Sequence, residues 1–215
     1  MPSPIRVAVI GAGAFGGWTA LFLLRRGAKV TLIDAFGTGN SRSSSGGETR
    51  VIRGTYGPDQ PYTVMTARAL KLWRENERRW KRRFVHPIGV LWMASENDDE
   101  WERGSVQELK RAKISYERLS SPALKKRWPQ INFEGVEWAV FEPKSGFLLA
   151  RAACQAVVES FIAEGGDYRV AAVTGEGLET GAWAREASLL QRPRIAGHLG
   201  SSRPRSCAFP GCSSA

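Results

Sequence analysis

The stretch VAVIGAGAFGG, Val7–Gly17, contains the pattern that decides the fold. It begins inside a continuous apolar run, Ile5–Ile10, of the kind that forms a buried parallel strand. Glycines follow at 11, 13 and 16, and the apolar segment after them stops at Gly27, which predicts a helix. A second apolar run, Ala28–Asp34, predicts another strand. The sequence therefore predicts a complete βαβ unit in about 30 residues.

The spacing of these glycines matches the fingerprint of a dinucleotide site. Gly11 permits a tight turn, Gly13 lets the backbone approach a pyrophosphate, and Gly16 lets the helix pack close to the sheet. The start of the helix presents free N–H groups and a partial positive charge to phosphates. Asp34 stands 18 residues after Gly16, where a carboxylate accepts hydrogen bonds from ribose hydroxyls and disfavours a 2′-phosphate. The predicted contacts are Gly11, Gly13, Ala14, Phe15, Gly16, Asp34 and Ala35, and the fingerprint leaves NAD and FAD both open.

A second unusual stretch, SSSGGETRVIRGTYG, spans Ser43–Gly57. Its small residues suit a loop whose hydroxyl and N–H groups, at Ser44, Ser45 and Gly46, face a pyrophosphate or the edge of a flavin. If Thr49–Gly54 forms a helical turn, Arg50 and Arg53 share one face. Two cations there suit an anionic reduced flavin and a substrate carboxylate. Taken without further information, two surface ion pairs are the better explanation of the arginines.

Composition limits the class of protein. The chain has 215 residues, three cysteines and a formal net charge of +10. Few cysteines argue against a disulfide framework and favour a reducing compartment, so we expect a cytoplasmic protein without a signal peptide or membrane span. The basic residues are dispersed, which indicates no specific nucleic-acid partner. Cys207 and Cys212, with His198 as the nearest helper, are too few for a metal site.

The rest of the chain alternates predicted helices and strands. Helices are expected at 61–84, 97–112, 120–129 and 150–164, and strands at 84–95, 136–149 and 167–173, with a turn at Pro143–Gly146. From Glu186 onward the chain is rich in Ser, Pro, Gly and Arg and has neither helix nor strand periodicity. Such a segment buries too little apolar surface to offset its ordering entropy, so residues 186–215 are predicted to be disordered or translated out of frame.

Four stretches, taken in order, carry a resemblance to a known family. They are VAVIGAGAFGGWTALFLLRRGAKVTLIDAF, GGETRVIRGTYG, KRWPQINF and FEPKSGFLLARAAC. Together they resemble the N-terminal half of flavoproteins of the D-amino-acid-oxidase type, especially monomeric sarcosine oxidases and N-methyltryptophan oxidases. The resemblance runs from about Ile5 to Val173, and the TRVIR and RWP motifs are more specific than the glycines.

The resemblance implies FAD as cofactor and a role for each matched residue. Asp34 would hold the adenosine ribose, Ser44, Ser45, Gly46 and Thr49 would lie against the flavin, Arg50 would tune the flavin ring, and Arg53 would bind a substrate carboxylate. The implied reaction is hydride transfer from a small amine or amino acid to the flavin, followed by reoxidation with oxygen. The chain lacks the histidine that the family often has near Ser45 or Gly46. A complete protein of this kind would be a monomer.

The implied fold class is α/β, with a Rossmann-like FAD-binding domain and an inserted, incomplete α+β substrate domain. We expect residues 1–84 and 150–185 to belong to the FAD-binding domain, 85–149 to the substrate domain, and 186–215 to a tail. Family members run to nearly twice this length, so we expect a truncated oxidase with reduced or no activity. Two alternatives stay open: a nucleotide-binding fragment without catalysis, and an NAD-dependent dehydrogenase.

Overall fold

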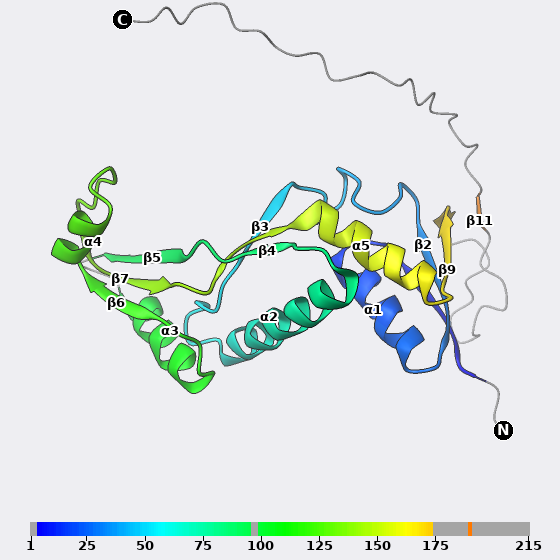
Figure 1. Ribbon diagram of the computed structural model, residues 1–215, viewed down its shortest axis with the longest axis horizontal. Coiled ribbons are helices and arrows are strands. Elements are labelled where there is room, and N and C mark those ends of the chain that lie inside the picture. The colour runs from blue at the N-terminus through cyan, green and yellow to red at the C-terminus, as the bar shows by residue number, and fades with distance from the viewer. Residues whose placement is uncertain (1–3, 96–98, 174–188, 191–215) are drawn as a thin grey trace, which may run out of the picture.

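The computed structural model describes residues 4–95, 99–173 and 189–190 and shows an elongated molecule (Figure 1). A parallel sheet with two helices forms one end, and an antiparallel sheet with two further helices forms the other. The long helix α2 (Gln60–Trp80) and a small sheet lie between the two ends. None of the helices in the described ranges is long and apolar enough to cross a membrane.

The parallel sheet confirms the predicted βαβ unit, although β1 alternates between exposed and half-buried residues and is not the buried strand that its apolar run predicts. Its strands are β1 (Arg6–Ile10), β2 (Lys29–Asp34) and β9 (Asp167–Val170), in the order β1-β2-β9. Helix α1 (Ala14–Arg25) connects β1 to β2, and α5 (Ala150–Ala163) packs beside α1 before the chain enters β9 (Figure 1). The parallel pairing places the ends of β1 and β2 side by side, with Ile10 opposite Ile33. The glycine turn therefore lies beside the residue at the end of β2.

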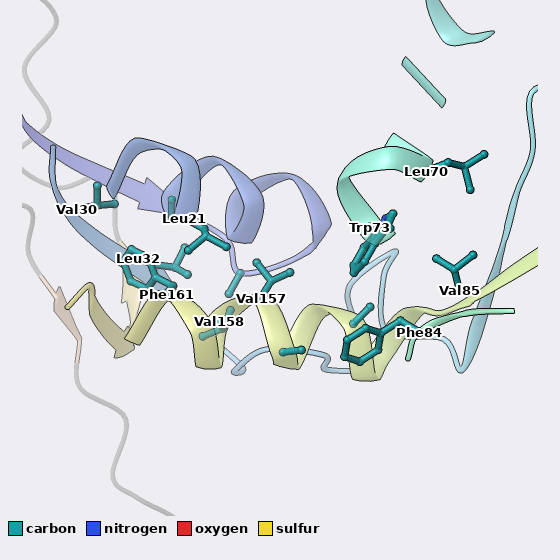
Figure 2. Close-up of a cluster of buried hydrophobic side chains, with 14 residues drawn as sticks. Leu21, Val30, Leu32, Leu70, Trp73, Phe84, Val85, Val157, Val158 and Phe161 are labelled. Atoms are coloured by element: carbon teal, nitrogen blue, oxygen red, sulfur yellow. The ribbon is translucent and has the colours of Figure 1, made fainter. Parts of the chain in front are cut away.

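The hydrophobic core at this end joins the sheet to α1 and α5. Leu21, Leu32 and Phe161 are fully buried there, and Figure 2 shows them gathered between the helices and the strands. Burying a side chain of this size stabilises the fold by about 1.5–3 kcal/mol. The same core continues through Trp73 of α2 and Phe84, so α2 is fixed to the end of the molecule that holds the parallel sheet.

The small central sheet corrects one expectation from the sequence. Its strands are β3 (Thr49–Ile52), β8 (Gly146–Leu149) and β4 (Val85–His86), with β8 in the middle. Thr49–Ile52 is thus extended, so the helical turn that would place Arg50 and Arg53 on one face does not form. The antiparallel pairing of Thr49 with Leu149 across the chain satisfies the backbone of this segment, which no local pattern could reveal.

The far sheet is antiparallel and consists of β5 (Val90–Ser95), β7 (Val136–Glu142) and β6 (Glu117–Ser120), with β7 in the middle. Helix α3 (Glu100–Arg111) packs on β5 and β7, and α4 (Ser121–Arg127) packs on β6 and β7. The single strand predicted over 84–95 is divided into β4 and β5 around Pro87. The predicted turn after β7 is confirmed, because the Ser145 N–H donates to the Glu142 carbonyl.

The last described elements also differ from expectation. The strand predicted over 167–173 is interrupted at Ala171, so β9 is followed by a separate strand β10 (Ala172–Val173). β10 pairs antiparallel with β11 (Leu189–Leu190). These two residues lie within the segment 186–215, which the sequence predicts to be disordered. The remainder of the predicted tail lies outside the described residues.

Candidate functional site

The glycine turn has the geometry that its sequence predicts. Gly11 has φ +97° and donates its N–H to the Ile33 carbonyl at 2.7 Å, which extends the β1–β2 pairing into the turn. A Cβ placed on Gly16 would lie 1.8 Å from the Gly11 carbonyl oxygen. A Cβ on Gly13 would meet only the Ser45 hydroxyl, at 3.7 Å. Gly16 therefore permits close packing within the protein, whereas Gly13 leaves space beside the start of the helix.

Asp34, at the end of β2, is bound to this turn. One carboxylate oxygen accepts the Ala12 N–H at 2.8 Å, and the other accepts the Phe36 N–H at 2.8 Å. Ala35, which lies between Asp34 and Phe36 in the sequence, is half-buried. The carboxylate thus holds the turn after β1 and the turn after β2 together. It also raises the pKa of the nearby Tyr168 phenol, an effect smaller than that of burial of the ring.

The start of α1 carries an oxygen acceptor from a distant segment. The Ala14 N–H donates to the Ser45 hydroxyl at 3.1 Å, across 31 residues of sequence. Phe15, the next residue of α1, is 90% exposed. Ser45 also contacts the buried thiol of Cys154, whose pKa is raised by burial and lowered to a lesser degree by this contact. The structure therefore brings Ser45 to the glycine turn.

The loop that contains Ser45 is fixed from two sides. The Gly46 carbonyl accepts hydrogen bonds from Arg151, at 3.0 Å from Nε and 2.8 Å from Nη2. The Ser44 carbonyl accepts a hydrogen bond from Nη2 of Arg50. Thr49, the first residue of β3, is exposed. Five predicted residues, Ser44, Ser45, Gly46, Thr49 and Arg50, thus lie in one segment attached to the glycine turn.

Arg151 is a residue of this site that the sequence interpretation missed. A signal was available, because a cation in the first turn of a helix opposes the helix dipole and needs a local reason. Here the reason is the Gly46 carbonyl together with the Glu48 carboxylate, whose oxygen lies 3.1 Å from Nη1. Gly46 itself admits no side chain, because a Cβ there would lie 2.0 Å from the Asn40 carbonyl oxygen.

Arg53 belongs to a different cluster from Arg50. Its Nε donates to the Thr55 carbonyl at 3.0 Å, and its guanidinium carbon lies 4.7 Å from the ring centroids of both Tyr56 and Trp92. The two arginines do not share a helical face, because Thr49–Ile52 is a strand. Arg50 lies beside the loop of the glycine turn, and Arg53 lies where the central sheet meets the far sheet. Neither arginine forms an ion pair with a described residue.

A buried carboxylate beside Arg53 was also missed. Glu142, at the end of β7, is fully buried and accepts hydrogen bonds from Gly54 and Thr55. The available signal was an acid at the end of the otherwise apolar run WAVFE. In the described ranges, no group of three or more histidine, cysteine or acidic side chains is placed to hold a metal ion.

Comparisons with known proteins identify relatives of this chain. A family model described as FAD dependent oxidoreductase matches residues 6–193. Monomeric sarcosine oxidase from Bacillus sp. (strain B-0618) is 30% identical over 165 residues, which is 77% of this chain and 42% of that protein. N-methyl-L-tryptophan oxidase from Yersinia pestis (strain Pestoides F) is 27% identical over 156 residues, covering 71% of this chain and 41% of the relative. The chain thus spans about two fifths of the length of these relatives.

Solved structures share the fold. L-proline dehydrogenase from P. horikoshii superposes with a TM-score of 0.67 at 20% identity, covering 81% of this chain and 46% of the other. NikD, an amino acid oxidase of nikkomycin biosynthesis, superposes with a TM-score of 0.63 at 23% identity, covering 82% and 47%. The family match covers both the glycine turn and the segment of the two arginines. The chain belongs to the family of FAD-dependent oxidoreductases.

Proposed function

We propose that this chain binds FAD at the glycine turn and takes part in the oxidation of a small amine or amino acid. The observation that carries the proposal is the hydrogen bond from Ala14 N–H to the Ser45 hydroxyl. An oxygen acceptor already lies at the start of α1, which is where the oxygens of a diphosphate bind in such folds. Gly13 leaves room beside it, so the residues present fit a dinucleotide.

Each predicted residue then has a role. Gly11, Gly13, Ala14, Phe15 and Gly16 would surround the diphosphate, and Asp34 with Ala35 would lie at the ribose. Ser44, Ser45, Gly46, Thr49 and Arg50 would lie along the cofactor toward its redox ring. When bound, FAD would supply the hydride acceptor, since the organic chemistry belongs to the cofactor. The contribution of the chain is to bind, orient and polarise.

Arg53 is the proposed anchor for the carboxylate of a substrate. Its Nε is engaged with Thr55, while its terminal Nη1 and Nη2 atoms have no hydrogen-bond partner among the described residues. A guanidinium held in this way can offer two parallel N–H groups to a carboxylate. The names of the relatives, sarcosine oxidase and N-methyl-L-tryptophan oxidase, suggest N-methyl amino acids as the substrates to test first.

The domain bounds, the oligomeric state, the compartment and the level of activity are also part of this proposal. We propose residues 1–84 and 150–185 as the FAD-binding domain and 85–149 as part of a substrate domain. We also propose a monomer in the reducing cytoplasm, because a chain with three cysteines suits such a compartment. Because the chain spans about two fifths of the length of its relatives, we expect low or absent turnover together with retained FAD binding.

The test is a comparison of FAD and NAD on the purified full chain. At a hundredfold excess over its Kd, a ligand stabilises the folded state by about 2.7 kcal/mol. We therefore expect FAD to raise the melting temperature by roughly 5–10 °C. We expect NAD to leave it unchanged, and flavin absorbance to follow the protein through gel filtration.

Peroxide release from sarcosine or N-methyltryptophan then separates an oxidase from a binding-only chain. FAD binding without peroxide favours the binding-only alternative. A thermal shift with NAD but none with FAD rejects the proposal and favours a dehydrogenase.

A further inference from the structure

Glu142 is a carboxylate in an unusual position. It is the last residue of β7, it is 0% exposed, and its four hydrogen-bond donors are all neutral groups. Burying a carboxylate is costly unless donors compensate for the lost water. Such a group, placed where the far sheet passes into the central sheet, calls for an explanation beyond packing.

Three of the four donors come from one short segment directly after β3. The Gly54 N–H donates to Oε2 at 2.7 Å, the Thr55 N–H donates to Oε1 at 3.0 Å, and the Thr55 hydroxyl also donates to Oε1. The Ser145 hydroxyl donates to Oε2 at 2.7 Å. Each carboxylate oxygen therefore receives one backbone N–H and one hydroxyl.

The same segment is held from its other side. The Thr63 hydroxyl of α2 donates to the Gly54 carbonyl at 2.9 Å. A Cβ on Gly54 would lie 2.7 Å from both Leu109 and Ile114, so the backbone is in close contact with the core of the far sheet. The peptide units on either side of Gly54 thus have their polar groups bonded to β7 and α2.

Arg53 immediately precedes this segment, which helps to fix the position of its side chain. Its Nε donates to the Thr55 carbonyl, and its guanidinium lies against Tyr56 and Trp92. Trp92 is paired with Val140, two residues before Glu142 in β7. The strand that ends in Glu142 therefore fixes both the backbone that holds Arg53 and one of the rings against which Arg53 packs.

We propose that Glu142 is a positioning residue that fixes the orientation of the Arg53 guanidinium, and through it the affinity of the site for a substrate carboxylate. The proposal rests on the function proposed above for Arg53. Glu142 does not touch the substrate in this scheme. It acts through Gly54 and Thr55, which carry its two backbone hydrogen bonds and the carbonyl that receives the Arg53 Nε.

Glu142→Gln is the sharpest variant, because it keeps the size of the side chain. In either orientation of the amide, the NH₂ group would face a backbone N–H and a hydroxyl. The hydrogen bond from the Gly54 N–H or the one from the Thr55 N–H is therefore lost. Ser145→Ala is the matched control. It removes one donor from the same carboxylate without touching the segment beside Arg53.

The experiment uses the ¹⁵N-labelled full chain, with the Arg53 Nε–H resonance assigned by its loss in Arg53→Lys. We expect hydrogen exchange at this group to be slow in the wild type and in Ser145→Ala and at least tenfold faster in Glu142→Gln. Sarcosine and dimethylamine, which lacks the carboxylate, are then titrated against the FAD-loaded protein. We expect sarcosine to bind about 10–100-fold more weakly to Glu142→Gln and dimethylamine to bind both proteins equally.

Unchanged exchange at Arg53 in Glu142→Gln, or equal sarcosine affinity, overturns the proposal even if the variant is less stable. If Glu142→Gln does not fold, Glu142→Asp keeps the charge but draws the carboxylate back from the Gly54 and Thr55 N–H groups, and unchanged exchange at Arg53 in that variant overturns the proposal equally. A wild-type chain that binds neither FAD nor sarcosine refutes the proposed function. Exchange at Arg53 would then still decide whether Glu142 positions it.

Discussion

Arg25 and Glu164, which are 139 residues apart in the sequence, form a two-pronged ion pair at the ends of α1 and α5. Nε lies 2.8 Å from Oε2, and Nη2 lies 2.7 Å from Oε1. The bond to Arg25 lowers the pKa of Glu164 from 4.5 to about 2, against the opposing effect of burial, and the Ser160 hydroxyl contributes to the shift. The pair therefore stabilises the packing of the two helices that flank the proposed FAD site.

This pair gives the stability of the chain a defined pH dependence. Because the folded-state pKa of Glu164 is depressed, its contribution is complete above pH 4.5 and is lost as the pH falls through about 2. We expect Glu164→Gln to lower the free energy of unfolding by about 1–3 kcal/mol at pH 7 and to flatten its fall in this window. Urea unfolding followed by tryptophan fluorescence measures both. Glu159→Gln, which breaks an exposed pair with Arg82, should cost less than about 1 kcal/mol, and equal losses in the two variants would contradict the assignment.

Gly16→Ala should destabilise the end of the molecule that holds the parallel sheet and α1, whether or not FAD is present. Its Cβ would lie 1.8 Å from the Gly11 carbonyl oxygen, so the helix must move away from the strand, at a cost of about 1–3 kcal/mol or more. Thermal unfolding of the purified chain measures the loss. An unchanged melting temperature would show that α1 does not approach β1 this closely.

Gly13→Ala should separate cofactor binding from stability. Its Cβ would have an ordinary contact with the Ser45 hydroxyl at 3.7 Å, and Gly13 has φ −76°, which any residue adopts. We therefore expect a melting temperature close to that of the wild type. Under the proposed function, the added methyl group occupies space beside the diphosphate and weakens FAD binding, as titration of flavin fluorescence would show. FAD affinity equal to that of the wild type would place the cofactor elsewhere.

Asp34→Ala should destabilise the chain even before any cofactor is added. The variant removes the acceptor of the Ala12 N–H, and Ala12 is 1% exposed. An unsatisfied buried donor costs about 1–3 kcal/mol, which denaturant unfolding of the cofactor-free chain detects. Asp59→Ala is a suitable control, because Asp59 is exposed and forms no side-chain hydrogen bond at the start of α2. A loss no larger than in this control would show that Asp34 serves the nucleotide alone.

Cys154 should react slowly in the folded chain. Burial raises the pKa of its thiol, and only the thiolate reacts with alkylating reagents. We expect iodoacetamide at pH 8 to modify Cys154 at least tenfold more slowly in the native protein than in urea. Peptide mapping by mass spectrometry distinguishes it from Cys207 and Cys212. Equal rates in the two conditions would contradict a thiol held beneath Ser45.

The local part of the fold could be predicted from the sequence. The predicted strands at 5–10 and 28–34 differ from β1 and β2 by a single residue at their starts. The glycine turn was predictable because Gly11, Gly16 and Asp34 act within one short βαβ unit. The glycine spacing is a usable signal because the residues that contact one another in this turn are close together in the sequence.

Long-range pairing was not predictable in the same way. Thr49–Ile52 is a strand only because β8 lies beside it, about a hundred residues later, and the helical spacing of Arg50 and Arg53 gave the wrong relation between them. Arg151 and Glu142 were missed for a similar reason. Each side chain forms hydrogen bonds to backbone groups of a distant segment. Every residue type carries such groups, so the sequence does not indicate which of them a side chain will bind.

The position of β1 at the edge of its sheet has a practical consequence. Among the described strands, β1 pairs with β2 alone, and Ile5, just before it, and Ile10, its last residue, are 74% and 66% exposed. An open strand edge between exposed isoleucines recruits strands from other molecules. Preparations of the chain should therefore associate as they are concentrated, and Ile5→Lys should delay the onset of turbidity.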